Sequence, residues 1–217
     1  MNFKSANDAS VAAPVQSLLR RPFLDGADDA VHRQRLRWLL QLLLAQDGST
    51  TRICQAIAGK PLTLQLRSQQ VTTDVPACVR AVLPGSQFIH RTTSLAAEGE
   101  IMMDNLVYVA LDGVAEPLRS GLDSGAVPIG PLLESLWVRR KALGPEVTAQ
   151  LCEQLWAEVG QADAPASRAY IITTPGGNLF VIAETFRRGM RIGYDEPVTP
   201  PAEAAPVRVC LAERGLR

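Results

Sequence analysis

The chain has 217 residues, of which 47% are hydrophobic and 20% are charged, and 22 Lys and Arg residues balance 22 Asp and Glu residues. This composition is typical of a globular protein with one or at most two domains, and it excludes a disordered chain. The balanced charge also argues against a dedicated nucleic-acid-binding protein, which would carry a strong basic excess.

Neither a membrane span nor a metal site is predicted. No segment approaches the roughly 18 uncharged apolar residues that a transmembrane helix needs, and the first residues lack the apolar core of a signal peptide. We therefore expect a cytoplasmic protein without a membrane partner. The four cysteines lie far apart with no C-x-x-C pair, so we expect neither a bound metal nor a redox-active cysteine pair; they are Cys54, Cys78, Cys152 and Cys210.

The first half of the chain begins with a polar leader over residues 1–28, followed by a helix over 29–46. Leucines recur there at three- and four-residue spacing, at Leu36, Leu39, Leu40, Leu43 and Leu44, and form a wide apolar face. The segment DGST then interrupts the helix, and Ser49 or Thr50 caps a second short helix that ends at Gly59.

Strand patterns follow. Alternation predicts a strand over 61–71, the segment 74–83 is ambiguous, and residues 86–97 and 101–112 form an antiparallel hairpin around the turn at 98–100. Because Met102 and Met103 are adjacent, one of them is expected in the core and the other outside.

The second half of the chain mixes helices with another hairpin. Short helices are predicted at 115–123 and from Pro128, an amphipathic helix at 145–160, and a hairpin at 167–174 and 179–186. A Pro- and Ala-rich extension covers 189–217, where 207–215 can add an edge strand. This pattern lacks regular βαβ alternation and predicts an α+β domain over 29–188 with an antiparallel sheet.

Two charged residues interrupt otherwise apolar strands. Glu184 shares one strand face with Phe180 and Ile182, so it is either exposed at the strand end, paired with a cation, or buried alone with a raised pKa that suits a general acid. Arg91 is either a sheet-surface arginine or a guanidinium that binds a planar carboxylate inside a cavity.

Two further candidates lie at helix starts. The loop DGSTTR contains Ser49 and Thr50, and the turn PIG contains Ile129 and Gly130. Free backbone N–H groups at a helix start favour anions, although ordinary capping explains both segments equally well. Other signals are weaker, since His32 lies on a solvated helix face and His90 lies on the strand face opposite to Arg91.

The order of these motifs resembles the chorismate pyruvate-lyases, over roughly residues 34–188. The shared features are a Leu-rich helix running into DGSTTR, Arg91 on a central strand, PIG opening a helix, and a hairpin that ends in VIAETF. The likeness is greatest to the 4-hydroxybenzoate synthases of mycobacterial phenolic-lipid pathways.

This resemblance implies a fold, a reaction and a set of roles. The fold is an antiparallel sheet of about six strands with helices on one side and helical flaps over an internal ligand site. The reaction eliminates pyruvate from chorismate and leaves 4-hydroxybenzoate without a cofactor. The implied roles are a carboxylate clamp for Arg91, an acid/base group for Glu184, and anion-binding backbone N–H groups at Ser49, Thr50, Ile129 and Gly130.

The chain also departs from the family pattern. Asp104 and Asn105 lie where ubiquinone-pathway members carry a second arginine and the mycobacterial branch has a Glu-Ser pair, and the extension past Arg188 is unusual. Two rival hypotheses therefore stay open. One is a non-catalytic aromatic-acid-binding module on the same fold, although such sensors carry a DNA-binding segment for which residues 1–28 are too short and too neutral. The other is a lyase for a related cyclohexadiene carboxylate.

Overall fold

The computed structural model describes residues 29–116, 118–187 and 190. One six-stranded antiparallel sheet has the order β1-β2-β3-β6-β5-β4. Its strands are β1 (Thr63–Thr72), β2 (Phe88–Ala97), β3 (Glu100–Ala110), β4 (Arg139–Ala142), β5 (Ser167–Thr174) and β6 (Gly177–Phe186). The predicted α+β class and the antiparallel sheet of about six strands are confirmed.

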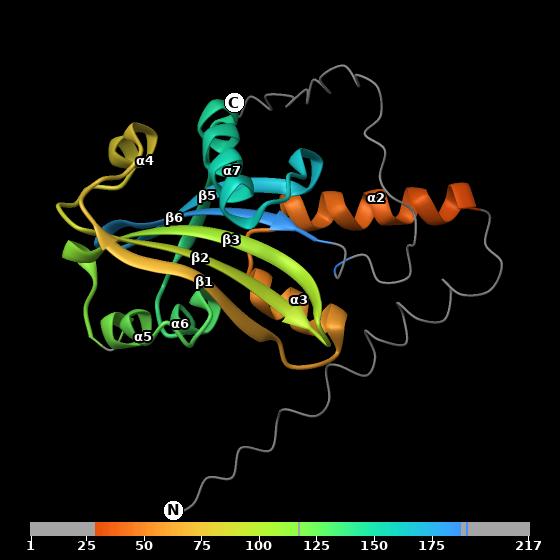
Figure 1. Cartoon of the computed structure of the whole chain (residues 1–217), viewed down its shortest axis with the longest axis horizontal. Coiled ribbons are helices and arrows are strands. Elements are labelled where there is room, and N and C mark those ends of the chain that lie inside the picture. The colour runs from red at the N-terminus through yellow and green to blue at the C-terminus, as the bar shows by residue number, and fades with distance from the viewer. Residues whose placement is uncertain (1–28, 117, 188–189, 191–217) are drawn as a thin grey trace, which may run out of the picture.

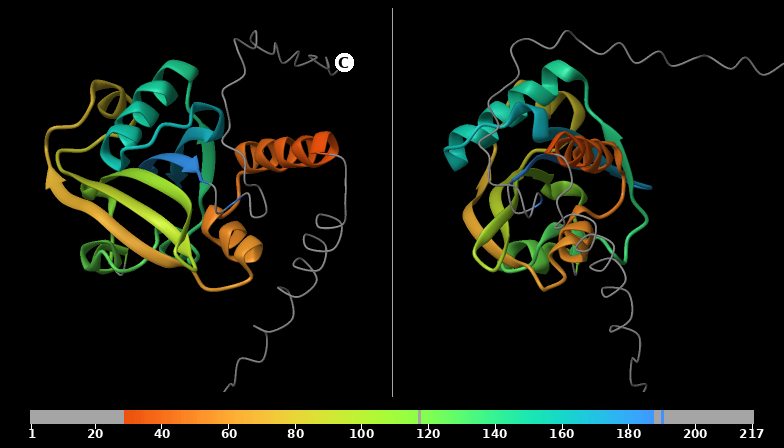
Figure 2. Two further views of the ribbon diagram at one scale, coloured as in Figure 1. Left: turned by 45° about the vertical axis from the view of Figure 1, so that its right-hand side comes forward. Right: turned by 90° about the vertical axis from the view of Figure 1, so that its right-hand side faces the viewer.

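Helices cover both faces of this sheet (Figure 1). On one face lie α4 (Ala77–Val82) and α7 (Pro145–Val159); on the other lie α3 (Thr50–Ala58), α5 (Leu118–Ser124) and α6 (Ile129–Leu132). Two 3₁₀ turns, Leu111–Gly113 and Ala164–Ala166, complete the connections. The curl of the sheet around the second helix layer is visible in Figure 2, and it creates the enclosed side on which a ligand site is expected.

The layer formed with α7 is a continuous apolar core. Leu151 and Leu155 of α7 pack on Leu106, Val181 and other residues of the central strands. The opposite layer contains a second cluster, in which Leu122 and Leu133 cover residues of β3 and β6. Because apolar side chains occur on both faces of β3 and β6, these two strands are buried almost throughout.

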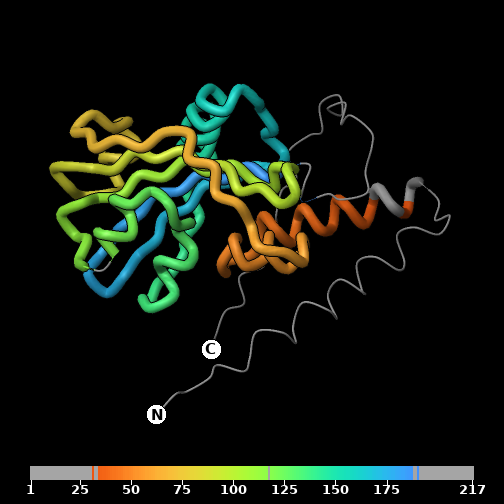
Figure 3. The backbone as a smooth tube through the Cα atoms, turned by 60° about the horizontal axis from the view of Figure 1, so that its bottom comes forward, coloured from red at the N-terminus to blue at the C-terminus, as the bar shows by residue number. Residues whose placement is uncertain are grey.

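Helix α2 (Asp29–Ala45) extends away from the sheet, as Figure 3 shows. The end nearest the domain is anchored by Leu43, which is buried, and by Leu39, Leu40 and Leu44, which pack against the same cluster. Trp38 and Leu42 remain exposed on this helix. In the described part of the chain, no helix combines the length and the apolar character that a bilayer crossing requires.

The structure differs from the sequence predictions at several points. The ambiguous segment 74–83 contains the short helix α4, the helix expected from Pro128 spans only four residues, and the short edge strand β4 was not predicted. Met102 and Met103 are both buried, which contradicts the expectation for this pair. The reason is a bulge: the register with β2 shifts by one residue there, so simple alternation fails. The leader 1–28, residues 207–215 and the side chain of His32 lie outside what the structure describes.

Candidate functional site

A cavity lies between the curled sheet and the start of helices α3 and α6. The empty space at this cavity, open solvent included, is about 490 Å³. All six residues singled out from the sequence line it: Ser49, Thr50, Arg91, Ile129, Gly130 and Glu184. The fold therefore brings together residues from four separate elements that the sequence could only suggest one by one.

Arg91 is almost completely buried, with 1% of its surface exposed. Its Nη2 donates to the backbone oxygens of Gly125 and Val127, each at 3.0 Å, so the loop before α6 holds the guanidinium in place. Nε and Nη1 are buried and have no hydrogen-bond partner among the described residues. Burial lowers the pKa of Arg91 from its ordinary value. Arg91 is therefore a cavity residue with two unused donors rather than a sheet-surface arginine.

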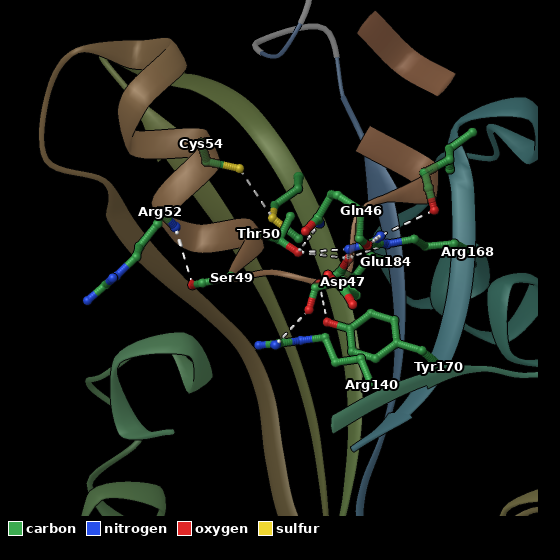
Figure 4. Close-up of polar contacts among 12 residues, drawn as sticks. Gln46, Asp47, Ser49, Thr50, Arg52, Cys54, Arg140, Arg168, Tyr170 and Glu184 are labelled. Atoms are coloured by element: carbon green, nitrogen blue, oxygen red, sulfur yellow. Dashed lines mark hydrogen bonds and ion pairs between the residues drawn. The ribbon is translucent and has the colours of Figure 1, made fainter. Parts of the chain in front are cut away.

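Glu184 is also buried, but its carboxylate has several partners (Figure 4). Oε1 accepts a hydrogen bond from the hydroxyl of Tyr170 at 2.6 Å. Oε2 accepts from Thr50 Oγ1 at 3.2 Å and from Nε and Nη2 of Arg168, both at 2.9 Å. The sequence left open whether Glu184 is exposed, paired with a cation or buried alone. The structure shows it buried and paired with Arg168.

Arg168 is a site residue that the sequence reasoning missed. Besides its ion pair, it donates to the backbone oxygens of Leu44 and Gln46 and to Thr50 Oγ1. Its guanidinium also lies over the Phe186 ring, at 5.5 Å from the centroid. Arg168 thus ties together the end of α2, the start of α3 and the carboxylate of β6. No local pattern marks Arg168, because its pairing with Glu184 depends on the register of the hairpin.

Tyr170 keeps its proton in this arrangement. Burial, together with the negative charge of Glu184, raises the pKa of Tyr170 well above its ordinary value. Its hydroxyl group therefore acts as a stable hydrogen-bond donor to Glu184 and not as a second negative charge in the cavity.

The two helix starts meet at Gly130. A Cβ atom at this position would lie 2.7 Å from Thr51 Oγ1 and 3.0 Å from Ser49 Oγ, so helix α6 approaches the start of α3 more closely than any other residue would allow. Ser49 is the N-cap of α3, and its Oγ accepts a 3.5 Å contact from the backbone N–H of Arg52. Whether backbone N–H groups at Thr50 and Ile129 hold an anion stays a prediction.

Asp104 and Asn105, the two residues that differ from the family pattern, point to opposite faces of β3. Asn105 lines the cavity. Asp104 points to the opposite face, where it forms a buried ion pair with Arg187 and accepts a hydrogen bond from Ser94. Only Asn105 is therefore in a position to contact a ligand.

Arg140 of β4 is a further cavity residue that was not predicted. Its Nη1 donates to the backbone oxygen of Asp47 at 2.9 Å, and its Nε is buried without a hydrogen-bond partner in the described ranges. Edge strand β4 has the sequence RRKA, which shows no apolar alternation, and this explains why the strand was overlooked.

The remaining wall of the cavity is largely apolar. Aliphatic side chains from β1, β2, β3, β5, β6 and the α6 region line it: Leu64, Leu95, Val107, Ile129, Leu133, Ile172 and Ile182. Thr93 and Asn105 add neutral polar groups between them. The cavity thus combines apolar walls with charged groups at defined points, as small-molecule sites do.

Comparisons with known proteins add little at the level of sequence. No family model and no curated protein matches the chain. Solved structures with some likeness include a possible transcriptional regulator, YydK, from Bacillus subtilis, with 10% identity, a TM-score of 0.37 and coverage of 59% of this chain. The match spans 58% of the YydK chain.

Two others have a similar degree of likeness. PhnF from Mycobacterium smegmatis shows 15% identity and a TM-score of 0.40, over 71% of this chain and 78% of its own. The C-terminal domain of the histidine utilization repressor from Pseudomonas syringae shows 12% identity and a TM-score of 0.37, over 64% of this chain and 99% of its own. Likeness this low carries no argument about what the present chain does.

Proposed function

We propose that this domain binds a small organic carboxylate, of the size of an aromatic acid, in the cavity between β2, β6 and α3. The observation that carries the proposal is Arg91, whose guanidinium is buried, fixed by the loop at Gly125 and Val127, and left with two unused donors. A carboxylate that occupies the cavity would accept from one of these donors.

Energetics favour such a ligand. Burying a charge is costly unless it is paired, and Arg91, although its Nη2 donates to two backbone oxygens, has no counter-ion among the described residues. Nε and Nη1 lie on different edges of the guanidinium, so a carboxylate in the cavity would accept a charge-assisted hydrogen bond from one of them. The apolar walls at Val107, Leu133 and Ile182 suit a ring or a short hydrocarbon body between the polar ends.

Glu184 fits a binding role. Its two oxygens already accept from Tyr170, Thr50 and Arg168, so the carboxylate is held in one position, where a ligand hydroxyl or amine can donate to it. A general acid must reach the substrate with a free oxygen, and both oxygens of Glu184 are already engaged by protein donors. This arrangement supports the binding module as the leading reading.

A second candidate is chorismate pyruvate-lyase activity, which rests on one specific observation. The residues to which the resemblance assigns roles all line the same cavity, from Ser49 and Thr50 through Arg91 to Ile129, Gly130 and Glu184. In that reaction Arg91 would clamp a carboxylate of chorismate. Glu184 would pass a proton to the ether oxygen of the departing enolpyruvate, and loss of a ring proton would give 4-hydroxybenzoate.

One experiment separates the two candidates. Calorimetric titration of the full chain with 4-hydroxybenzoate measures binding, and incubation of concentrated protein with chorismate, followed by chromatography, measures pyruvate and 4-hydroxybenzoate. Binding without turnover supports the binding module, whereas turnover supports the lyase. Parallel incubation with isochorismate tests a lyase for a related cyclohexadiene acid.

The matched variants are Arg91→Ala and Arg139→Ala. Arg139 lies on edge strand β4 and is exposed, and it is not among the residues that line the cavity. Arg91→Ala is expected to remove binding, while Arg139→Ala leaves it unchanged. Unchanged affinity in a folded Arg91→Ala protein would contradict the proposal.

A further inference from the structure

We infer that Arg140 is a second anion anchor of this cavity and that the preferred ligand carries two separated acidic groups. The inference rests on the proposed binding function and deepens it by naming the class of ligand. It starts from the second arginine that lines the cavity with an unused donor, Nε of Arg140.

The position of Arg140 directs its side chain to the enclosed face of the sheet. It pairs with Ile172 of β5, and Ile172 and Tyr170 line the same cavity. The side chain extends beside the Tyr170 ring toward the loop between α2 and α3, where Nη1 donates to the oxygen of Asp47 (Figure 4). This contact holds the guanidinium at the cavity wall, while Nε stays without a partner among the described residues.

Two of the three positive charges at the cavity have no acidic partner in the described part of the chain, so a ligand could neutralise them. Glu184 is neutralised by Arg168, with which it forms an ion pair. Neither Arg91 nor Arg140 forms an ion pair with an acidic side chain of the described residues; both donate only to backbone oxygens. A dianionic ligand would therefore compensate both guanidinium groups, and a monoanion only one.

The sheet order favours two separate acidic groups over one doubly charged group. Strands β2 and β4 are four positions apart in the order β1-β2-β3-β6-β5-β4. With about 4.8 Å between neighbouring strands, the path along the sheet between them is roughly 19 Å. Three strands, β3, β6 and β5, lie between β2 and β4 in this order, so the two arginines reach the cavity from opposite sides of its sheet wall.

Three simple probes test the inference by calorimetry on the full chain. Benzoate carries one carboxylate, terephthalate carries two at opposite ends of the ring, and phenyl phosphate carries two charges on one group. We expect wild-type protein to bind terephthalate more tightly than the other two. Arg140→Ala should weaken terephthalate binding about ten- to a hundred-fold and benzoate binding less than about two-fold.

Arg139→Ala is the matched control, because this neighbour on β4 is exposed, pairs with Thr173 and lies on the alternate strand face. It should change none of the three affinities. Arg140→Gln removes the charge but keeps a donor for Asp47, so it provides a second variant if Arg140→Ala is poorly folded.

Each outcome decides the matter. The inference is overturned, while the proposed function stands, if wild-type protein binds benzoate as tightly as terephthalate. The same holds if the Arg140 variants weaken the binding of both acids equally. If phenyl phosphate shows the same dependence on Arg140 as terephthalate, the requirement for separated groups is wrong. If wild-type protein binds none of the acids, the proposed function fails and this inference fails with it.

Discussion

Arg168 and Glu184 are direct register partners on β5 and β6, and their side chains form an ion pair in which Nε and Nη2 both lie 2.9 Å from Oε2. Both side chains are largely buried, with 12% and 4% exposed. This pair fixes the carboxylate at the wall of the cavity and links it to the end of α2. We therefore expect this pair to stabilise the domain and also to position a carboxylate in the site.

Removing one member should destabilise the domain strongly. Arg168→Ala leaves Glu184 as a buried charge with fewer partners, and we expect a loss of about 3–5 kcal/mol in the free energy of unfolding. Urea denaturation measures it. The control is Arg119→Ala, which breaks the exposed pair with Asp123 and should cost less than about 1 kcal/mol. Equal costs for the two variants would contradict a structural role of the buried pair.

Glu184→Gln distinguishes charge from shape at the same position. The amide keeps the size of the side chain and an oxygen that can accept from Tyr170, but it cannot neutralise Arg168. We expect 4-hydroxybenzoate binding to persist and any turnover of chorismate to disappear. Titration and product analysis on the same preparation provide the two measurements. Full turnover in the variant would remove Glu184 from a lyase mechanism.

The contact between α6 and α3 should depend on a glycine. In Gly130→Ala the new Cβ would meet Thr51 Oγ1 at 2.7 Å, so the helices must separate, at an expected cost of about 1–3 kcal/mol in unfolding free energy. Gly176→Ala is the control, since its Cβ would meet its nearest neighbour, Thr174 Oγ1, at an ordinary 3.6 Å. Thermal and urea unfolding of both variants check this, and equal stability would show that the close approach is not required.

Stability should fall at alkaline pH because of buried tyrosines. Burial raises the pKa of Tyr108 to about 12, whereas an unfolded tyrosine titrates near 10. The folded state therefore keeps a proton that the unfolded state releases. The corresponding stability, about 2–3 kcal/mol, is complete below pH ~10 and is lost as the pH rises toward about 12.

Tyr108→Phe tests this directly. Urea unfolding across that pH range should show a shallower decline for the variant than for wild type, with the remaining decline owed in part to Tyr170, whose pKa is also raised. Identical slopes for the two proteins would show that Tyr108 ionises in the folded state at its usual pKa.

The sequence by itself determined the class of fold and pointed to six residues that line one cavity. Alternation over 86–112 and 167–186 predicted the two central hairpins, and a charge inside each apolar strand marked Arg91 and Glu184. Such patterns are local, because the side chains of a strand alternate at every second residue whatever the strand pairs with. The two unpredicted cationic residues of the site, Arg168 and Arg140, depend on strand pairing and carry no local pattern.

Only the tertiary structure decided which residues face one another. Counting back from the turn, where Thr174 pairs with Gly177, would place Ala183 opposite Arg168. A bulge at Leu179 shifts the register by one residue and places Glu184 there instead. A shift of one residue moves every later side chain to a different partner, and it follows from packing across the whole sheet. For this physical reason, the ion pair at the centre of the site could not be read from the sequence of either strand.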